Sequence, residues 1–182
     1  MLQIREISVV FGATEVLQAV SFGIGPGDGV ALVGANGAGK TTLLRCLVGE
    51  MRPDAGKVVL NSGVKLAYLA QEEEFLFEGS AIERALSFEP DLLPLYRGIQ
   101  TERYELIQDY SDRGGYVMED LIRTCAENFG VADVLDTPYE HLSRGMRRKV
   151  DLVGMFSAEA DLMVFDEPIN FLDIQGITAF EE

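Results

Sequence analysis

The chain is poor in cysteine and has no long apolar run, and each shortage excludes a class of protein. Its 182 residues include two cysteines, Cys46 and Cys125, which are too few for a disulfide framework and lack metal-ligand spacing. Both lie in helix-like segments, so we expect buried, reduced thiols in a cytoplasmic protein. No apolar run approaches the length of a membrane span, and the N-terminus has no basic-then-apolar signal peptide. We therefore expect no direct insertion into a membrane.

Positive charge is also scarce. Fifteen Lys and Arg face thirty Asp and Glu, which gives a net charge of −15. This balance argues against free-standing binding to a phosphate backbone, although a local basic patch is still allowed. The 47% hydrophobic and 25% charged content is ordinary for a globular protein, and the length suffices for one core with a small appended lobe.

The strongest positive signal is a glycine-rich segment, residues 34–42, which reads G-A-N-G-A-G-K-T-T. Residues 30–33 (V-A-L-V) predict a buried strand before it, and residues 42–48 predict a helix after it. In that context the backbone N–H groups and the helix N-terminus can converge on phosphate oxygens, with Lys40 on the β- and γ-phosphates and Thr41 on Mg²⁺. A glycine-rich turn that binds nothing is the alternative, and the Lys-Thr pair with both flanks disfavours it. The predicted nucleotide-binding residues of this loop are Gly34, Ala35, Asn36, Gly37, Ala38, Gly39, Lys40, Thr41 and Thr42.

A second signal lies at residues 161–167, D-L-M-V-F-D-E, an apolar run that ends in two carboxylates. Buried parallel strands carry such runs, and ligands collect at their carboxyl ends. There Asp166 can hold Mg²⁺ against the phosphates, and Glu167 can orient or deprotonate water. A helix N-terminus with acids in its first turn is the alternative, because Pro168 follows. Beside a phosphate loop, the strand-end interpretation is favoured.

Residues 142–149, L-S-R-G-M-R-R-K, open a predicted helix with Ser143 as its N-cap. A helix start with an exposed Ser and Gly is also an anion site, but a cap alone is the favoured interpretation of this segment in isolation. Four of the fifteen basic residues lie in residues 144–149, which we interpret as a solvated face. The apolar positions of this helix are Met146, Val150, Val153 and Phe156.

The texture of the chain changes along its length. Up to about residue 71, short β-rich runs alternate with turns, and from residue 72 to 139 helix formers and acids dominate. Residues 118–129 predict one helix, residues 101–110 a shorter one, and residues 112–115 a break. The acidic run Glu72-Glu73-Glu74 is interpreted as a solvated face. The predicted buried stripe of the longer helix is Leu121, Ile122, Cys125, Ala126 and Phe129.

Taken in order, these segments resemble the nucleotide-binding domains of ABC ATPases, and the resemblance covers the chain from end to end. Residues 34–42 are similar to the Walker A loop, residues 162–167 to Walker B, residues 142–146 to the signature L-S-G-G-Q, and residues 170–173 to the D-loop. Gln71 falls where the Q-loop glutamine follows a strand. Phe11 matches the aromatic that stacks on adenine, with a plain core Phe as the alternative.

The resemblance implies an α/β fold: a P-loop NTPase core of ABC type with an N-terminal antiparallel β lobe and an inserted helical subdomain. The core would take residues 1–72 and 140–182, and the helical subdomain residues 73–139. ATP and Mg²⁺ would be bound, with Phe11 and Gln71 joining the loop residues and Glu167 as the catalytic carboxylate. The implied metal ligands are Thr41, Gln71 and Asp166. The implied signature residues, which act on the ATP of a partner domain, are Ser143, Arg144, Gly145 and Met146.

Within the family, residues 166–173 (D-E-P-I-N-F-L-D) are most similar to the ABC-F group, in which two ATPase domains share one chain and many members act on ribosomes. We therefore expect as partners the ribosome and a second ATPase domain, which would lie in the same chain of the intact protein or come from a homodimer mate. We interpret the chain as similar to a first ABC-F domain, either a fragment or a naturally short form. The alternatives are the ATP-binding subunit of a membrane transporter and a nucleotide-binding module that does not hydrolyse ATP.

Four features depart from the family pattern. Arg144 replaces the first signature glycine, Met146 replaces Gln or Glu, and Phe171 replaces the D-loop His. The chain also ends before the position of the switch histidine, and its one histidine, His141, precedes the signature.

These departures predict that the 182-residue chain hydrolyses ATP negligibly by itself, although the intact protein is expected to be an ATPase. Losing one group that neutralises transition-state charge costs on the order of 10²–10³ in rate. Steady-state ATPase measurement tests this, with Glu167→Gln as the control for contaminating enzymes. Turnover of about one per second that disappears in Glu167→Gln would show that neither the switch histidine nor a second ATPase domain is essential.

Overall fold

The computed structural model describes residues 1–71 and 77–181, so the predicted acidic run Glu72-Glu73-Glu74 lies outside the described residues. The chain divides into two compact units. Unit 1 consists of Met1–Tyr68 and Ala160–Asp166, and unit 2 of Leu69–Glu159 and Glu167–Glu182.

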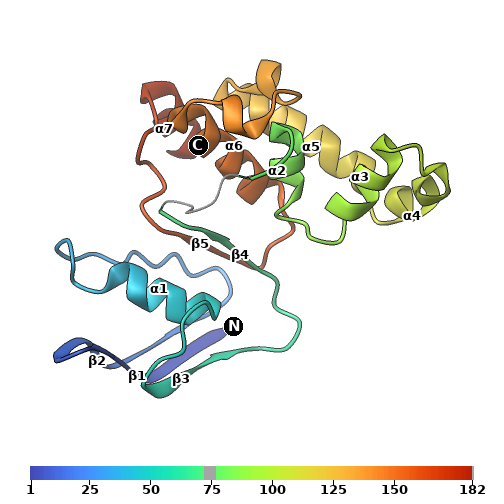
Figure 1. The fold of residues 1–182 in the computed structure, drawn as a ribbon. Coiled ribbons are helices and arrows are strands. Elements are labelled where there is room, and N and C mark those ends of the chain that lie inside the picture. The colour runs from blue at the N-terminus through green and yellow to red at the C-terminus, as the bar shows by residue number, and fades with distance from the viewer. Residues whose placement is uncertain (72–76, 182) are drawn as a thin grey trace. The chain divides into compact units, whose positions relative to one another are not determined.

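Unit 1 begins with an antiparallel sheet whose strand order is β2-β1-β3 (Figure 1). β1 alternates between buried residues such as Leu2 and Ile4 and exposed ones, as expected for a sheet with one covered face. The predicted antiparallel β lobe is therefore confirmed. Its strands are β1 (Leu2–Phe11), β2 (Thr14–Ile24) and β3 (Ala55–Leu60).

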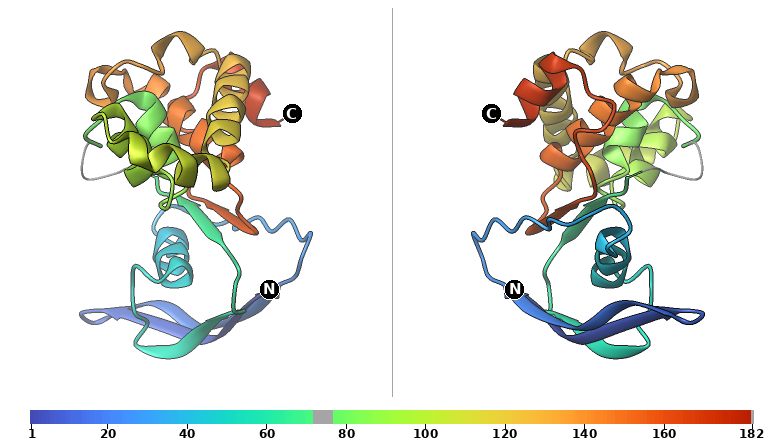
Figure 2. Two further views of the ribbon diagram at one scale, coloured as in Figure 1. Left: turned by 90° about the vertical axis from the view of Figure 1, so that its right-hand side faces the viewer. Right: turned by 90° about the vertical axis from the view of Figure 1, so that its left-hand side faces the viewer.

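Helix α1 (Lys40–Val48) covers that sheet, as both views of Figure 2 show. Its residues Leu43, Cys46 and Leu47 are buried in one core cluster with Leu2, Ile4 and other β1 residues. A second, two-stranded sheet pairs β4 (Leu66–Leu69) with β5 (Leu162–Phe165), and Leu162 and Val164 of β5 join the same cluster. The helix predicted after the glycine loop is confirmed, and Cys46 is buried as expected.

The buried strand predicted at residues 30–33 is wrong for this structure. The segment is not a strand, and Val30, Leu32 and Val33 are 58%, 43% and 90% exposed. An extended run has no internal hydrogen bonds, so it becomes a strand only where another strand pairs with it. Among residues 1–71 and 77–181, the two sheets do not include this segment.

Unit 2 is built of helices (Figure 1). Among them, α2, α5 and α6 contribute most of the unit's buried residues. α6 buries Val150, Leu152, Val153 and Met155 completely, and α2 does the same for Leu86. The α-helices are α2 (Ala81–Leu86), α3 (Leu93–Gln100), α4 (Ile107–Asp112), α5 (Gly115–Phe129), α6 (Arg144–Ser157) and α7 (Ile174–Glu181). Three 3-10 turns lie between them: η1 (Tyr104–Leu106), η2 (Ala132–Val134) and η3 (Tyr139–His141).

The predicted helix at residues 118–129 is confirmed within α5, but its buried stripe is only partly right. Ile122, Ala126 and Phe129 are buried, whereas Leu121 is 48% exposed and Cys125 is half-buried. Leu121 points away because it lies about 100° around the helix from Ile122, outside the face that meets α6. The break predicted at residues 112–115 separates α4 from α5 as expected.

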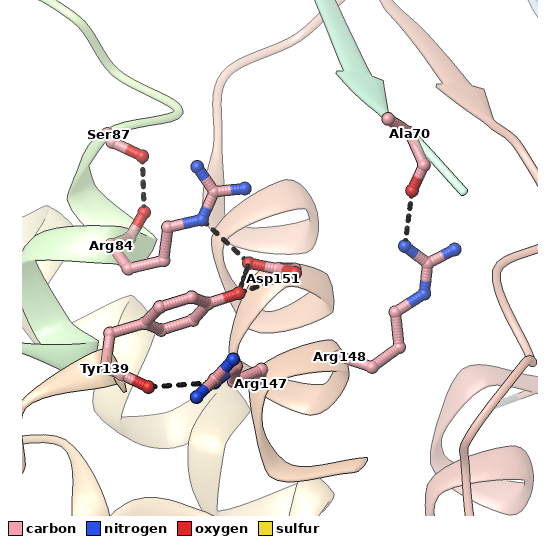
Figure 3. Close-up of polar contacts among 7 residues, drawn as sticks. All are labelled: Ala70, Arg84, Ser87, Tyr139, Arg147, Arg148 and Asp151. Atoms are coloured by element: carbon pink, nitrogen blue, oxygen red, sulfur yellow. Dashed lines mark hydrogen bonds and ion pairs between the residues drawn. The ribbon is translucent and has the colours of Figure 1, made fainter. Parts of the chain in front are cut away.

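A buried carboxylate joins α6 to α2 and η3 (Figure 3). Arg84 of α2 places Nε 2.7 Å from Oδ1 of Asp151, and the Tyr139 hydroxyl donates to both carboxylate oxygens at 2.9 and 3.0 Å. Arg84 is 9% and Asp151 7% exposed. The guanidinium also lies over the rings of Phe77, Phe88 and Tyr139. The buried Asp151 carboxylate is thus matched by the Arg84 guanidinium and the Tyr139 hydroxyl, and the guanidinium by the carboxylate and the aromatic rings.

This division by contacts places α6 with the helices, whereas the sequence analysis assigns residues 140–182 to the ATP-binding core. The predicted domain boundaries stay a prediction. Within the described part of the chain, no helix is both long and apolar enough to cross a bilayer.

Gly39 ends the glycine loop in a conformation that other residues resist. Its φ is +89°, and an added Cβ would meet Leu17 Cδ2 and Val16 Cγ1 at 2.9 Å and Val16 O at 3.1 Å. Gly37 has a similar φ of +79° with nothing within 4 Å of an added Cβ. An added side chain would strain the backbone at both positions, but only at Gly39 would it also clash with β2.

We therefore predict that Gly39→Ala lowers the free energy of unfolding more than Gly37→Ala does. The left-handed conformation costs roughly 1–2 kcal/mol in each variant, and the clash with β2 adds overpacking of about 1–3 kcal/mol in Gly39→Ala. Urea denaturation of the two variants measures the difference. Equal losses of stability would show that β2 gives way without cost.

A second prediction concerns the buried carboxylate. Asp151→Ala leaves the Arg84 guanidinium buried without its carboxylate partner, so unfolding should become easier by about 3–5 kcal/mol. The double variant Arg84→Met/Asp151→Leu removes both charges and should lose far less. Chemical denaturation followed by circular dichroism compares them, and an equal loss in both variants would contradict the argument.

Candidate nucleotide-binding site

The glycine loop of unit 1 is exposed from Gly34 to Ala38 and then enters α1 at Lys40. The Lys40 ammonium donates to the carbonyls of Gly34 at 3.0 Å and Ala35 at 3.1 Å, so the side chain folds back over the start of its own loop. A turn closed by Ala38 N–H donating to Ala35 O at 3.2 Å shapes the loop.

The N-terminus of α1 has no side-chain cap, because Gly39 occupies the N-cap position. The first N–H groups of the helix and the Lys40 ammonium therefore lie at the same end of one nine-residue helix. Backbone donors, the helix dipole and a cation are the groups that hold a phosphate.

Two oxygen-bearing side chains of unit 1 suit Mg²⁺. Thr41 lies in the first turn of α1, and Asp166 follows β5 directly and is 3% exposed. Within residues 1–71 and 77–181 no three His, Cys, Asp or Glu gather as a metal site. Mg²⁺ fits this donor set, because it is commonly held by one or two protein oxygens together with substrate phosphates and water.

Phe11 ends β1 and is 52% exposed. A core phenylalanine would be buried, so the alternative that Phe11 is a plain core residue is excluded. The aromatic ring is accessible for stacking on a ligand, and its role with adenine stays a prediction.

Gln71 and Glu167 meet within unit 2. Gln71 Nε2 donates to Glu167 Oε2 at 2.8 Å, and Asn170 Nδ2 donates to the same oxygen at 2.5 Å. Glu167 itself has φ of +48°, a strained value for a side-chain-bearing residue. The next helix, α7, begins at Ile174, so the helix N-terminus considered for Asp166 and Glu167 is wrong and the strand-end interpretation is confirmed.

The signature-like segment starts α6 as predicted. Ser143 caps the helix by accepting from Met146 N–H at 3.3 Å. The Arg144 guanidinium lies over the Phe171 ring, 5.8 Å from its centroid. An added Cβ on Gly145 would lie 2.9 Å from Phe171 O, so this glycine allows the two segments to approach. Two of the departures from the family pattern, Arg144 and Phe171, are therefore in contact.

The basic run at the start of α6 was interpreted as a solvated face, and that interpretation is wrong for two of its residues. Arg148 and Lys149 are 5% and 7% exposed. The Lys149 ammonium lies 3.0 Å from the Asp173 carboxylate. The Gly176 N–H and then Lys149 hold the pKa of Asp173 below its usual range. Arg147 donates to the carbonyls of Tyr139 and Glu140. Arg147 and Lys149 therefore bind protein oxygens, and Arg148 and Lys149 are buried from water. Phe156, one of the apolar positions of this helix, is 41% exposed.

The predicted site residues are distributed over both units. Unit 1 holds Phe11, residues 34–42 and Asp166, and unit 2 holds Gln71, residues 143–146 and Glu167. The sequence analysis gave no individual role to Arg148 or Asn170, although both lie in segments that it singled out. Helical spacing could have indicated Arg148, because Leu152 and Met155, both completely buried, follow it at i+4 and i+7 on the same face.

Comparison with known proteins agrees with the resemblance to ABC ATPases. A family model described as ABC transporter matches residues 17–170. The chain is similar to the uncharacterized ABC transporter ATP-binding protein YfmM of Bacillus subtilis, 29% identical over 97% of this chain and 38% of that protein. It is also 29% identical to the cytochrome c biogenesis ATP-binding export protein CcmA of Rhodopseudomonas palustris, over 97% of this chain and 80% of that protein.

A solved ATP-binding subunit of an ABC transporter superposes with a TM-score of 0.75 and 25% identity, covering 98% of this chain and 71% of that one. The chain thus spans well under half of YfmM and most of the two shorter proteins. The P-loop fold of ABC type, with its antiparallel β lobe and helical segments, is confirmed. Because the family model covers most of its length, the chain belongs to the ABC transporter family, as an ATP-binding domain.

Proposed function

We propose that this chain binds MgATP through the glycine loop and α1, as the ATP-binding part of a membrane ABC transporter. The observation that carries the proposal is the Lys40 ammonium on the carbonyls of Gly34 and Ala35, beside the uncapped start of α1. A cation already held at the loop can move to the β- and γ-phosphates, where it exchanges two hydrogen bonds to uncharged carbonyl oxygens for contacts with charged phosphate oxygens.

The proposed roles in binding follow from chemistry. The backbone N–H groups of the loop and α1 would take the phosphates, and the Phe11 ring would stack on the base. Thr41 and Asp166 would hold Mg²⁺, which supplies charge neutralisation at the phosphates. The part predicted for Gln71 at the metal stays a prediction.

The proposed role of Glu167 in hydrolysis rests on its contacts within unit 2. Gln71 and Asn170 both donate to Oε2, which fixes the orientation of the carboxylate. An oriented carboxylate can accept a proton from water that attacks the γ-phosphate, which is positioning rather than covalent catalysis. A second ATPase domain would complete the site with its own signature, as the sequence analysis expects of residues 143–146.

The partner is a correction to the expectation from sequence. Residues 166–173 favoured an ABC-F protein on the ribosome, but the matched relatives are described as ATP-binding proteins of ABC transporters and of export, so the ribosome is not supported. We place the transporter first for that reason. ABC-F is kept as the second candidate, because YfmM is long enough to hold two regions of this size. Co-purification with a membrane protein would favour the transporter, and sedimentation with ribosomes would favour ABC-F.

The test of nucleotide binding is Lys40→Ala. Removing the ammonium should reduce the affinity for MgATP by at least about tenfold, because a hydrogen bond to a charged group is lost at the phosphates. Isothermal titration calorimetry of wild type and variant measures this, with the exposed Lys57 of β3 as the matched control in Lys57→Ala. Equal affinity in wild type and Lys40→Ala would overturn the proposal.

A further inference from the structure

Arg148 of α6 binds three backbone carbonyls at once. Nη1 donates to Ala70 O at 2.6 Å, Nη2 to Glu167 O at 3.0 Å and Nε to Pro168 O at 3.1 Å. Figure 3 shows the guanidinium directed at the Ala70 carbonyl, which follows β4. Ala70 and Glu167 belong to segments far apart in the chain, so one buried side chain joins both to the same helix.

The chemistry of this contact requires arginine. The planar guanidinium presents several N–H groups in a fixed fork, so it can serve three carbonyls in different directions. Its burial makes each hydrogen bond stronger, because little water competes for the carbonyls. Lysine carries its charge on one compact ammonium and cannot span the same three acceptors.

The anchored residues are the backbone positions that aim Gln71 and Glu167. Ala70 directly precedes Gln71, and Glu167 is held at its own carbonyl and at that of Pro168. Their side chains then meet in the 2.8 Å hydrogen bond from Gln71 Nε2 to Glu167 Oε2. The φ of +48° at Glu167 is unfavourable by itself and persists only where surrounding contacts fix it.

We propose that Arg148 is a positioning residue that sets Gln71 and Glu167 in register with each other. It does so through the backbone carbonyls of Ala70, Glu167 and Pro168. The consequence for ATP hydrolysis rests on the proposed function, whereas the positioning itself does not. Arg147 offers a matched comparison, because it also donates to two backbone carbonyls but anchors Tyr139 and Glu140 instead.

The experiment follows the Gln71 side-chain amide by nuclear magnetic resonance, with the signal identified by its absence in Gln71→Leu. In wild type the proton facing Glu167 should exchange with water more slowly than in a free glutamine. In Arg148→Met that exchange should accelerate by at least about tenfold, since the hydrogen bond to a carboxylate is released. Arg147→Met should leave the exchange rate of this proton unchanged. A general loosening of α6 would instead raise the rate in both variants.

Arg148→Lys keeps the charge and provides a second variant if Arg148→Met does not fold. It should give an intermediate exchange rate, because the ammonium can retain only part of the contacts. Wild-type exchange in Arg148→Lys, an equal effect of Arg147→Met, or exchange at the free-glutamine rate in wild type itself would each overturn the proposal.

A nucleotide titration separates this proposal from the proposed function. MgATP should still bind Arg148→Met, with an affinity lowered by no more than about tenfold, the cost of about one hydrogen bond, because Lys40, Thr41 and Asp166 belong to the other unit and only Gln71 among the predicted metal ligands is disturbed. If wild type fails to bind MgATP while the Gln71 signal responds to Arg148 and not to Arg147, the positioning role stands and the proposed function falls. Loss of MgATP binding in Arg148→Met with an unchanged Gln71 signal would overturn the positioning role instead.

Discussion

The helical unit depends on the polar side chains that α6 buries. Asp151 faces Arg84 and Tyr139, while Arg148 and Lys149 face the segment from Glu167 to Asp173. Buried charges are expensive unless they are matched, so each of these contacts tolerates few alternatives. Hydrogen-bond donors and acceptors at fixed points add a directional constraint to the apolar packing of the helix. The segment that carries Glu167 is therefore held in place by the helix that begins at the signature-like residues.

The sequence predicted what depends on local chemistry. The glycine loop, the helix after it, the Ser143 cap and the carboxylates after β5 each follow from a few neighbouring residues, and the structure has all of them. The strand at residues 30–33 failed because a strand requires a partner, and partners are not a local property. The hydrogen bonds of Arg148 were missed for a related reason. Its acceptors are backbone carbonyls at Ala70, Glu167 and Pro168, which no residue type reveals in advance.

Two departures from the family pattern, Arg144 and Phe171, are explained better together than separately. Arg144 and Phe171 look unrelated in the sequence, yet the guanidinium lies over the ring in the structure. The same segment is approached by Gly145, the signature glycine that this chain retains. The Arg144 side chain at the start of α6 is thus partly engaged in a contact with Phe171, an aromatic residue of its own unit. The motif that resembles L-S-G-G-Q therefore makes contacts within its own chain, whatever role it has toward a partner.

The division of the chain between its units has a consequence for the order in which the protein forms during synthesis. Lys65 and Asp161, which hold β4 and β5 together at their starts, are 96 residues apart. The helices α2 to α6 lie between them in the sequence and contact one another over shorter separations. Short loops close faster than long ones, so these helices can assemble while the second sheet still lacks one of its strands. On a growing chain, the strand that leads to Asp166 arrives after the helices α2 to α6, so Asp166 and Glu167 join the structure later than the glycine loop does.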